Sequence, residues 1–326
     1  MRVLIVSYAF APSIGGVETA SQMLAEELQR RGHEVAVVTA TECAAPPSFS
    51  YPVHFQPSPW RLLALHRWAD VVLHNSMSLR FAWPLLLHPR KWAIVHTGDY
   101  RPGAIRRFAV NRAANITISP ATAQTLPVPS IVIANAYRQS TFIHRNRGAR
   151  DYQFGFVGRL VSDKGADNLL QALALLGQQG LRPRCAIIGA GPEEAALKSQ
   201  AQLLNVDGQV DFLGPKRDAD LAVALNDIDC LVVPSVWNEP FGIVALEGIA
   251  CGCLVIGSQG GGLKDAIGAC GLTYPNGDVA ALAAAMRRVL DEPSLAATLR
   301  ANAPAHLARH SPQAVVDAYL EVMQRA

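Results

Sequence analysis

Apolar and polar positions along this chain fall into two kinds of block. Short, almost continuous apolar runs are typical of buried parallel strands, and longer blocks with a helical pattern separate them. In the first part of the chain, the pattern predicts a helix at residues 16–31 and strands at residues 2–8, 34–39, 71–73, 92–96, 116–119 and 131–134. Strands that alternate with helices predict a doubly wound α/β domain with a parallel sheet.

The same alternation begins again after residue 150. It predicts strands at 152–157, 184–188, 210–213, 230–233 and 254–256, and helices at 166–176, 193–204, 279–291, 295–305 and 312–325. Between the two series lies a polar, arginine-containing segment, residues 138–150, which we interpret as the hinge region. We therefore expect Rossmann-like domains at residues 1–145 and 146–310. A terminal helix at 311–326 is a candidate for packing back on the first domain.

The length of 326 residues suits two domains that each bury a core. Half of the residues are hydrophobic and 17% are charged, which is typical of globular proteins. No window approaches about 18 uninterrupted apolar residues, and the first apolar run is too short for a signal peptide. The six cysteines lack metal-ligand spacing, so we expect buried thiols, a reducing cytoplasmic location and no bound metal.

Charge is distributed unevenly between the two halves. Residues 1–150 hold 16 Lys and Arg against 7 Asp and Glu, whereas residues 151–326 hold 13 against 19. A basic half indicates an anionic partner, which here could be a lipid-linked acceptor or an anionic membrane surface. Arg106, Arg107, Phe108 and Arg112 predict a short basic helix that either contacts such a membrane or is a solvated basic face with Phe108 in the core. We expect no nucleic-acid partner.

The stretch from residue 234 to residue 248 is the most informative part of the sequence. A strand pattern precedes it, and a helical pattern follows from residue 243 to residue 250. The free N–H groups of Gly242, Ile243 and Val244 at the start of that helix suit a phosphate. Glu239 and Glu247 flank this site, and carboxylates there suit sugar hydroxyls better than phosphate. The stretch therefore predicts a nucleotide-sugar pocket.

The string Pro-Ser-x-x-x-Glu-Pro-Phe-Gly-x-x-x-Leu-Glu, residues 234–247, resembles the signature of retaining glycosyltransferases of family 4. The resemblance implies a GT-B fold, in which two Rossmann-like domains face each other across a cleft. The N-terminal domain would bind the acceptor and the C-terminal domain the donor. The resemblance also implies that Glu239 binds hydroxyls of the transferred sugar, that Glu247 binds the ribose, and that Phe241 lines the donor site. The reaction would need neither a metal nor a cofactor and would follow a front-face mechanism.

Further motifs of the second half match the same family. Gly158-Arg159-Leu160 is followed by Lys164-Gly165, so that an arginine fork and a lysine could converge on one diphosphate. Gly189 and Gly191 fit a Gly-x-Gly-Pro turn on the nucleoside side of the site. Phe212 and Leu213 resemble the segment that lines the base pocket of relatives, mostly through backbone groups.

In the first half, Gly15 and Gly16 open a helix after the first strand, where the family carries Gly-Gly-x-Glu near the donor phosphates and the acceptor. Glu18 then becomes a candidate acceptor contact. His96 and Asp99 follow another strand, where His96 could orient the sugar ring or the acceptor hydroxyl; the alternative is a loop histidine with a structural role. Asn75 is a candidate acceptor contact or a cap.

These patterns predict a retaining glycosyltransferase that uses a nucleoside diphosphate sugar, with UDP or GDP as the nucleotide. The candidate catalytic residues are Glu239, His96, Arg159 and Lys164. The acceptor is expected to be a glycan or a lipid-linked molecule, reached in the cytoplasm or at the inner face of the membrane. Two alternatives remain open: a nucleotide-sugar epimerase with the GT-B fold, and a non-catalytic nucleotide-sugar binding protein.

Overall fold

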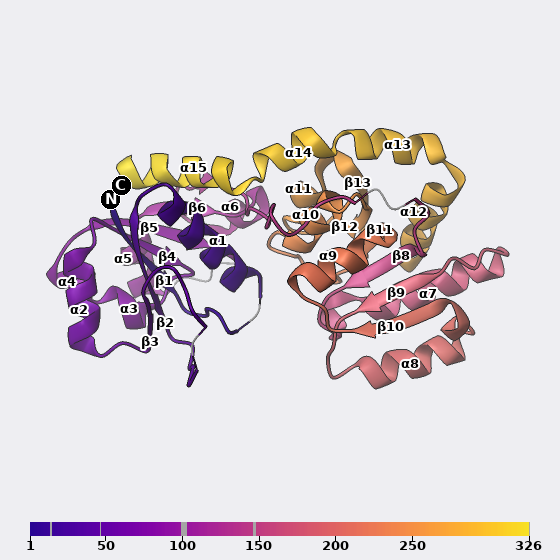
Figure 1. Ribbon diagram of the computed structural model, residues 1–326, viewed down its shortest axis with the longest axis horizontal. Helices are drawn as coiled ribbons and strands as arrows, with labels where there is room; N and C mark the ends of the chain where they lie inside the picture. Colours follow the sequence, from indigo (N-terminus) through magenta and orange to yellow (C-terminus); the bar gives the residue numbers. More distant parts are fainter. Residues whose placement is uncertain (14, 46, 99–102, 146–147, 326) are drawn as a thin grey trace. The chain divides into compact units, whose positions relative to one another are not determined.

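The computed structural model describes residues 1–13, 15–45, 47–98, 103–145 and 148–325 (Figure 1). The chain divides into two compact units, each built on one parallel sheet. Unit 1 comprises Met1–Tyr137 and His310–Ala326, and unit 2 comprises Arg138–Arg309. The C-terminal segment therefore returns to the unit in which the chain begins.

The described residues of unit 1 form a seven-stranded parallel sheet with the order β3-β2-β1-β4-β5-β6-β7. Its strands are β1 (Arg2–Ser7), β2 (Glu34–Thr39), β3 (Val53–Phe55), β4 (Val71–Asn75), β5 (Lys91–His96), β6 (Ala114–Thr117) and β7 (Ile131–Val132). Its helices are α1 (Gly16–Arg30), α2 (Pro59–Trp68), α3 (Leu79–Ala82), α4 (Pro84–Leu87), α5 (Ala104–Val110), α6 (Pro120–Thr125) and α15 (Pro312–Arg325).

The C-terminal helix α15 is tied to α1 within unit 1. Arg31, which follows α1, forms an ion pair with Asp317, and its Nη2 donates to Gln313 O over 2.8 Å. Val316 and Met323 of α15 are buried, so the helix adds an apolar stripe to the core of unit 1.

The described residues of unit 2 form a six-stranded parallel sheet with the order β10-β9-β8-β11-β12-β13. Its strands are β8 (Tyr152–Val157), β9 (Cys185–Ile188), β10 (Val210–Gly214), β11 (Ile228–Val233), β12 (Leu254–Ser258) and β13 (Gly271–Tyr274). Its α-helices are α7 (Ala166–Gln178), α8 (Glu194–Leu203), α9 (Asp218–Asn226), α10 (Ile243–Ala250), α11 (Leu263–Ile267), α12 (Val279–Asp291), α13 (Pro293–Ala301) and α14 (Ala303–Arg309). Short 3₁₀ turns lie at η1 (Ser162–Lys164), η2 (Asp207–Gln209) and η3 (Gly268–Cys270).

In both sheets the order of the strands reverses beside the first strand of the unit, so the prediction of two doubly wound α/β domains is confirmed. The first strand of each sheet, β1 or β8, has an early strand on one side and a late strand on the other. Loops that leave the carboxyl ends of such a pair run to opposite faces of the sheet, which opens a crevice between them. In unit 2 the pair is β8 and β11.

The predicted strands are all present, with ends shifted by at most two residues. The predicted helix at 295–305 is wrong, because the structure has two helices there. Asn302 ends α13, and its side chain donates to Ala269 O over 2.9 Å. Pro304 lacks the N–H that would continue the hydrogen bonding of α13, so a new helix, α14, begins at this point.

The polar segment 138–150 begins at the boundary of the two units and contacts unit 2 in its described part. Arg138 forms an ion pair with Asp218 over 2.9 Å, and the Arg145 N–H donates to Asn226 Oδ1 over 2.6 Å. The Arg150 guanidinium donates to Cys251 O over 3.0 Å at the end of α10. These contacts place residues 138–145 in unit 2, whereas the sequence analysis ended the first domain at residue 145.

The cysteines are free thiols, as expected, and all except the partly exposed Cys43 are buried. Within the part of the chain that the structure describes, no helix is both long enough and apolar enough to cross a membrane.

Candidate functional site

The loops after β8 and β11 meet at the point where the strand order of unit 2 reverses. Gly165, in the loop after β8, has φ +69°, and a Cβ there would lie 2.0 Å from Pro234 O. Only glycine permits this approach between the two backbones. The Val236 N–H also donates to Asp163 O over 3.0 Å. The two loops therefore form one rigid surface at the carboxyl ends of the strands.

The Glu239 carboxylate lies at the centre of that surface. It is 8% exposed, and its Oε1 accepts a hydrogen bond from Ser235 Oγ over 2.7 Å. Lys164 Nζ donates to the same oxygen and forms an ion pair with it. Among the described residues, no hydrogen bond reaches Oε2. The carboxylate is therefore held by one oxygen, which leaves the other for a ligand.

The backbone around Glu239 is also fixed. Glu239 O accepts from the Gly262 N–H over 2.7 Å, in the loop after β12. Asn276, in the turn after β13, receives the Gly260 N–H on its Oδ1 over 2.8 Å and donates through Nδ2 to Trp237 O over 3.1 Å. Four loops at one edge of the sheet are thus hydrogen-bonded to one another.

Lys164 occupies an aromatic and acidic environment rather than open solvent. Its Nζ lies 5.2 Å from the ring centroid of Trp237, a cation–π distance, and its partner Glu239 is largely buried. Arg159, on the same loop, is exposed. The motif predicts that Arg159 and Lys164 converge on a diphosphate, which stays a prediction; in the structure Lys164 bonds to Glu239.

Helix α10 begins beside this pair. Gly242 is its N-cap and provides no side-chain cap, so the first N–H groups of the helix have no partner within it. Ile243 and Val244 are partly exposed in the first turn, whereas the Phe241 side chain is buried. Phe241 can therefore contribute to a site through its backbone, and its ring belongs to the core.

Glu247 lies in the second turn of α10. Its pKa is raised from 4.5 to about 7, chiefly because burial disfavours the charged form; Arg138 opposes this shift and Asp218 adds to it. An ionised Glu247 is therefore poorly solvated in the folded protein. A carboxylate held in this condition is typical of functional sites, where a ligand supplies the missing hydrogen bonds.

The loop after β9 packs on the loop after β8 through its glycines. Gly189 has φ +153°, and a Cβ there would lie 1.8 Å from Gly158 O. Leu160 N–H donates to Ala190 O over 3.0 Å, and Gly191 follows directly. These glycines are required by the backbone contact, whatever the loop binds.

The two remaining donor-site candidates lie on the adjacent strand. Phe212 and Leu213 are partly buried on β10, where Lys198 Nζ lies 5.4 Å from the Phe212 ring centroid.

In unit 1, the candidate side chains make contacts within the fold. Asn75, at the end of β4, is buried and donates to Ser21 Oγ over 2.6 Å, so it joins the strand to α1. His96, at the end of β5, is also buried; its Nε2 lies 2.9 Å from Asn115 Oδ1, and burial lowers its pKa.

The loop after β1 contains the other candidates of unit 1. Gly15 is the N-cap of α1, and Gly16 is its first residue. Glu18, in the first turn, accepts a hydrogen bond from Ser13 Oγ over 3.1 Å. Asp99 lies outside the described residues.

Sequence reasoning missed Ser235, Trp237 and Asn276 as parts of the site. Ser235 and Trp237 lie inside the recognised string, but nothing in the string says which side chain bonds to Glu239. Asn276 lies in a turn far along the chain, and its role became visible only in the folded structure. Among the described residues, no group of three or more His, Cys, Asp or Glu could hold a metal ion.

Two family models match the chain. The model of glycosyl transferases group 1 matches residues 139–306, and that of the glycosyl transferase 4-like domain matches residues 15–170. The chain belongs to the glycosyl transferases group 1 family. The resemblance inferred from residues 234–247 is therefore confirmed.

Named relatives of this family share about a third of their residues with the matched part. A D-inositol 3-phosphate glycosyltransferase of Saccharomonospora viridis is 36% identical over 182 residues, which is 52% of this chain and 42% of the relative. A glycogen synthase of Mycobacterium tuberculosis is 39% identical over 143 residues, which is 43% of this chain and 34% of the relative. The chain thus spans less than half the length of these curated relatives.

Solved structures with the same fold cover the whole chain. Anabaena HepE in complex with UDP superposes with a TM-score of 0.84 at 20% identity and covers 100% of both chains. Sucrose-phosphate synthase from Thermosynechococcus elongatus gives a TM-score of 0.80 at 21% identity and covers 99% of this chain and 98% of that one. The expected GT-B fold is therefore confirmed.

Replacing Glu247 by glutamine is expected to stabilise the protein at neutral pH. Its folded-state pKa is raised from 4.5 to about 7, so the unfolded chain releases this proton at a lower pH than the folded chain does. Wild-type stability therefore falls as pH rises through this window, by at most about 3 kcal/mol for this group. Urea denaturation should show a stabilised Glu247→Gln variant at about pH 8 and little difference at about pH 4. The same difference at both pH values would contradict the shifted pKa.

Proposed function

We propose that this protein is a retaining glycosyltransferase that transfers a sugar from a nucleoside diphosphate sugar to a hydroxyl of a glycan or lipid-linked acceptor. The observation that carries the proposal is the anchored Glu239, whose Oε1 is held by Lys164 and Ser235 beside the start of α10. Membership of the glycosyl transferases group 1 family supports it. So does the fold of HepE, which is described in complexes with UDP, with UDP and glucose, and with UDP-glucose.

The donor diphosphate is proposed to bind at the N-terminus of α10. The N–H groups of Ile243 and Val244, for which the described residues provide no partner, and the helix dipole favour an anion at this position. Arg159 lies exposed on the neighbouring loop and can add a bidentate contact. The ribose is assigned to Glu247, because its two hydroxyls would supply the hydrogen bonds that this poorly solvated carboxylate lacks. We propose uridine as the base, following the nucleotide named for HepE.

Lys164 would have two partners in the course of the reaction. It bonds to Glu239 in the structure, and an arriving diphosphate would compete for the same ammonium group. When Lys164 turns towards the diphosphate, Glu239 loses its counter-ion but keeps the hydrogen bond from Ser235. The carboxylate would then accept hydrogen bonds from hydroxyls of the transferred sugar. Binding of the donor diphosphate to Lys164 would thereby free the Glu239 carboxylate for the hydroxyls of the sugar.

In the proposed transfer step, the bond between the sugar carbon and the leaving diphosphate breaks. The acceptor oxygen bonds to that carbon on the same face, and its proton passes to an oxygen of the leaving diphosphate. Lys164, Arg159 and the N–H groups of α10 would stabilise the negative charge that develops on this group. These positive groups would take the place of the metal ion that other enzymes use, so we propose that the reaction needs no metal ion. His96 is proposed to orient the sugar or the acceptor.

Removing either cation should weaken nucleotide binding. Arg159→Ala and Lys164→Ala are each expected to lower the affinity for UDP by about 1.5–3 kcal/mol, because each removes a charged hydrogen bond to the diphosphate. Isothermal titration calorimetry with UDP, GDP and ADP measures the loss and identifies the base. Arg287→Ala, which removes an exposed arginine of α12, serves as the control. Unchanged dissociation constants in both site variants would refute the assignment.

Replacing Glu239 by glutamine should separate binding from turnover. The neutral amide can still accept from Ser235 but no longer holds Lys164 by charge, so UDP is expected to bind tighter by about 1.5 kcal/mol. Turnover of the sugar donor should fall, because the anionic acceptor for its hydroxyls is lost. A variant that loses UDP affinity in parallel with Lys164→Ala would exclude this exchange of partners.

The overall reaction is tested by incubating the protein with UDP- and GDP-sugars in excess EDTA. Release of the nucleoside diphosphate, with transfer or hydrolysis that retains the anomeric configuration, is expected to persist. NMR of the anomeric proton gives both the rate and the stereochemistry. An epimerised donor, an unconsumed donor, or activity that EDTA abolishes and Mn²⁺ restores would each contradict part of the proposal.

A further inference from the structure

The sheet of unit 1 separates two sets of helices. The connection from β1 to β2 runs in one direction along the sheet, and those from β3 to β4, β4 to β5 and β5 to β6 run in the other. Because such crossovers are right-handed, α1 lies on one face and α2 to α5 lie on the opposite face. Figure 1 shows α2, α3 and α4 on one side of the strands and α1 on the other. Leu62, Leu65 and Phe81 of α2 and α3 accordingly share one core cluster with Leu4 and Val6.

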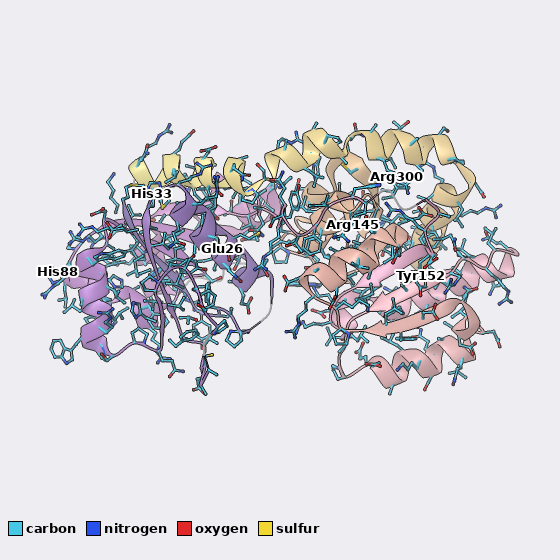
Figure 2. The ribbon with its side chains drawn as sticks, in the orientation of Figure 1. Glu26, His33, His88, Arg145, Tyr152 and Arg300 are labelled. Atoms are coloured by element: carbon cyan, nitrogen blue, oxygen red, sulfur yellow. The ribbon has the colours of Figure 1, made fainter. Side chains whose placement is uncertain are left out.

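The two faces carry opposite charge. Helices α2 to α5 have no Asp or Glu among their described residues; their arginines are Arg61, Arg67, Arg80, Arg106 and Arg107. On the other face, α1 and α15 together contain five acidic residues and two arginines. Figure 2 marks the two faces with His88, which follows α4, on one side and Glu26 of α1 on the other. We call the outward surface of α2 to α5 the arginine face.

Large apolar side chains are exposed on the arginine face. Trp60 of α2 is 81% exposed and Leu86 of α4 is 71% exposed, with Leu87 beside it. Phe108 of α5 is also exposed and stacks against Arg112, 4.2 Å from its ring centroid. The sequence alternative that placed Phe108 in the core is therefore wrong. Several large apolar side chains exposed among the arginines of one face mark a candidate interaction surface.

We propose that the arginine face docks on an anionic phospholipid bilayer. No ion pair joins the five arginines to a carboxylate among the described residues, so their charge can complement the negative surface potential of such a membrane. Trp60 and Phe108 have the amphipathic rings that partition into the headgroup region, and Leu86 and Leu87 can reach the acyl boundary. A nucleic acid would also attract the arginines, but its phosphates offer nothing to the two leucines. The docking goes beyond the proposed transfer, because it needs neither donor nor acceptor.

The test is cosedimentation of the full chain with large vesicles. Vesicles of phosphatidylcholine alone are compared with vesicles that also contain phosphatidylglycerol, at low and at high salt. The wild type should pellet with the anionic vesicles at low salt and lose this binding on addition of salt, because the charges are then screened. Equal pelleting with both lipids, or none with either, would overturn the proposal.

Two groups of variants separate charge from apolar contact. Arg61→Gln with Arg106→Gln and Arg107→Gln should weaken binding about 100-fold, or about fivefold per arginine. Trp60→Ser with Leu86→Ser and Leu87→Ser should weaken it at least about tenfold while leaving all charges in place. The matched controls lie in unit 2: Arg184, Arg287 and Arg288 to Gln for the charges, and the exposed Leu203→Ser for the apolar group.

The outcomes distinguish the membrane from other partners. Binding that the unit 2 controls weaken as much as the arginine-face variants would refute docking through this face. Binding that depends on the arginines but not on Trp60, Leu86 and Leu87 would indicate a general polyanion site, and competition by duplex DNA would identify it as such. Donor hydrolysis in vesicle-free buffer should be unchanged in every variant, so failure of docking and failure of the proposed transfer remain distinguishable.

Discussion

The close approach of Gly165 to Pro234 O determines how the charged groups of unit 2 are arranged. A side chain at residue 165 would separate the loops after β8 and β11 and would move Lys164, its neighbour, away from Glu239. The same two loops carry Ser235 and the segment that leads into α10. An ion pair, a hydrogen bond and a helix N-terminus therefore share one position because two backbones touch, and each would change if that contact were lost.

The negative charges of Glu239 and Glu247 are compensated to different extents. Glu239 is buried next to a cation and a hydroxyl donor, so its charge is compensated inside the protein. Glu247 is partly exposed and has weaker compensation, because Arg138, the nearby cation, is itself paired with Asp218. A fold selected only for stability would replace such a carboxylate by a neutral residue. A carboxylate with so little compensation fits the proposed contact with the ribose hydroxyls.

Local patterns made most of the fold predictable from the sequence. The strands of both sheets are short apolar runs, and their identity depends on neighbours within a few residues. Strands β3 and β13 were missed because neither is a long apolar run: β3 has three residues, and β13 contains Gly271 and Thr273. The break between α13 and α14 was missed because the helical pattern runs through Pro304. The spacing of the motif identified the candidate residues within 234–247. It could not predict that Lys164 pairs with Glu239. The two residues are 75 positions apart, and only the folded loops bring them together.

The two sheets share one topology but use the ends of their strands differently. In unit 1, Asn75 and His96 lie at strand ends; Asn75 donates to Ser21, and His96 Nε2 contacts Asn115, so both side chains also brace the fold. In unit 2, one carboxylate oxygen of Glu239 and the first N–H groups of α10 stay available for a ligand. The shared architecture therefore determines where a binding site can form, and the side chains at that position determine whether one forms. By this criterion the proposed donor site lies in unit 2, and unit 1 is marked by the charge difference between the two faces of its sheet.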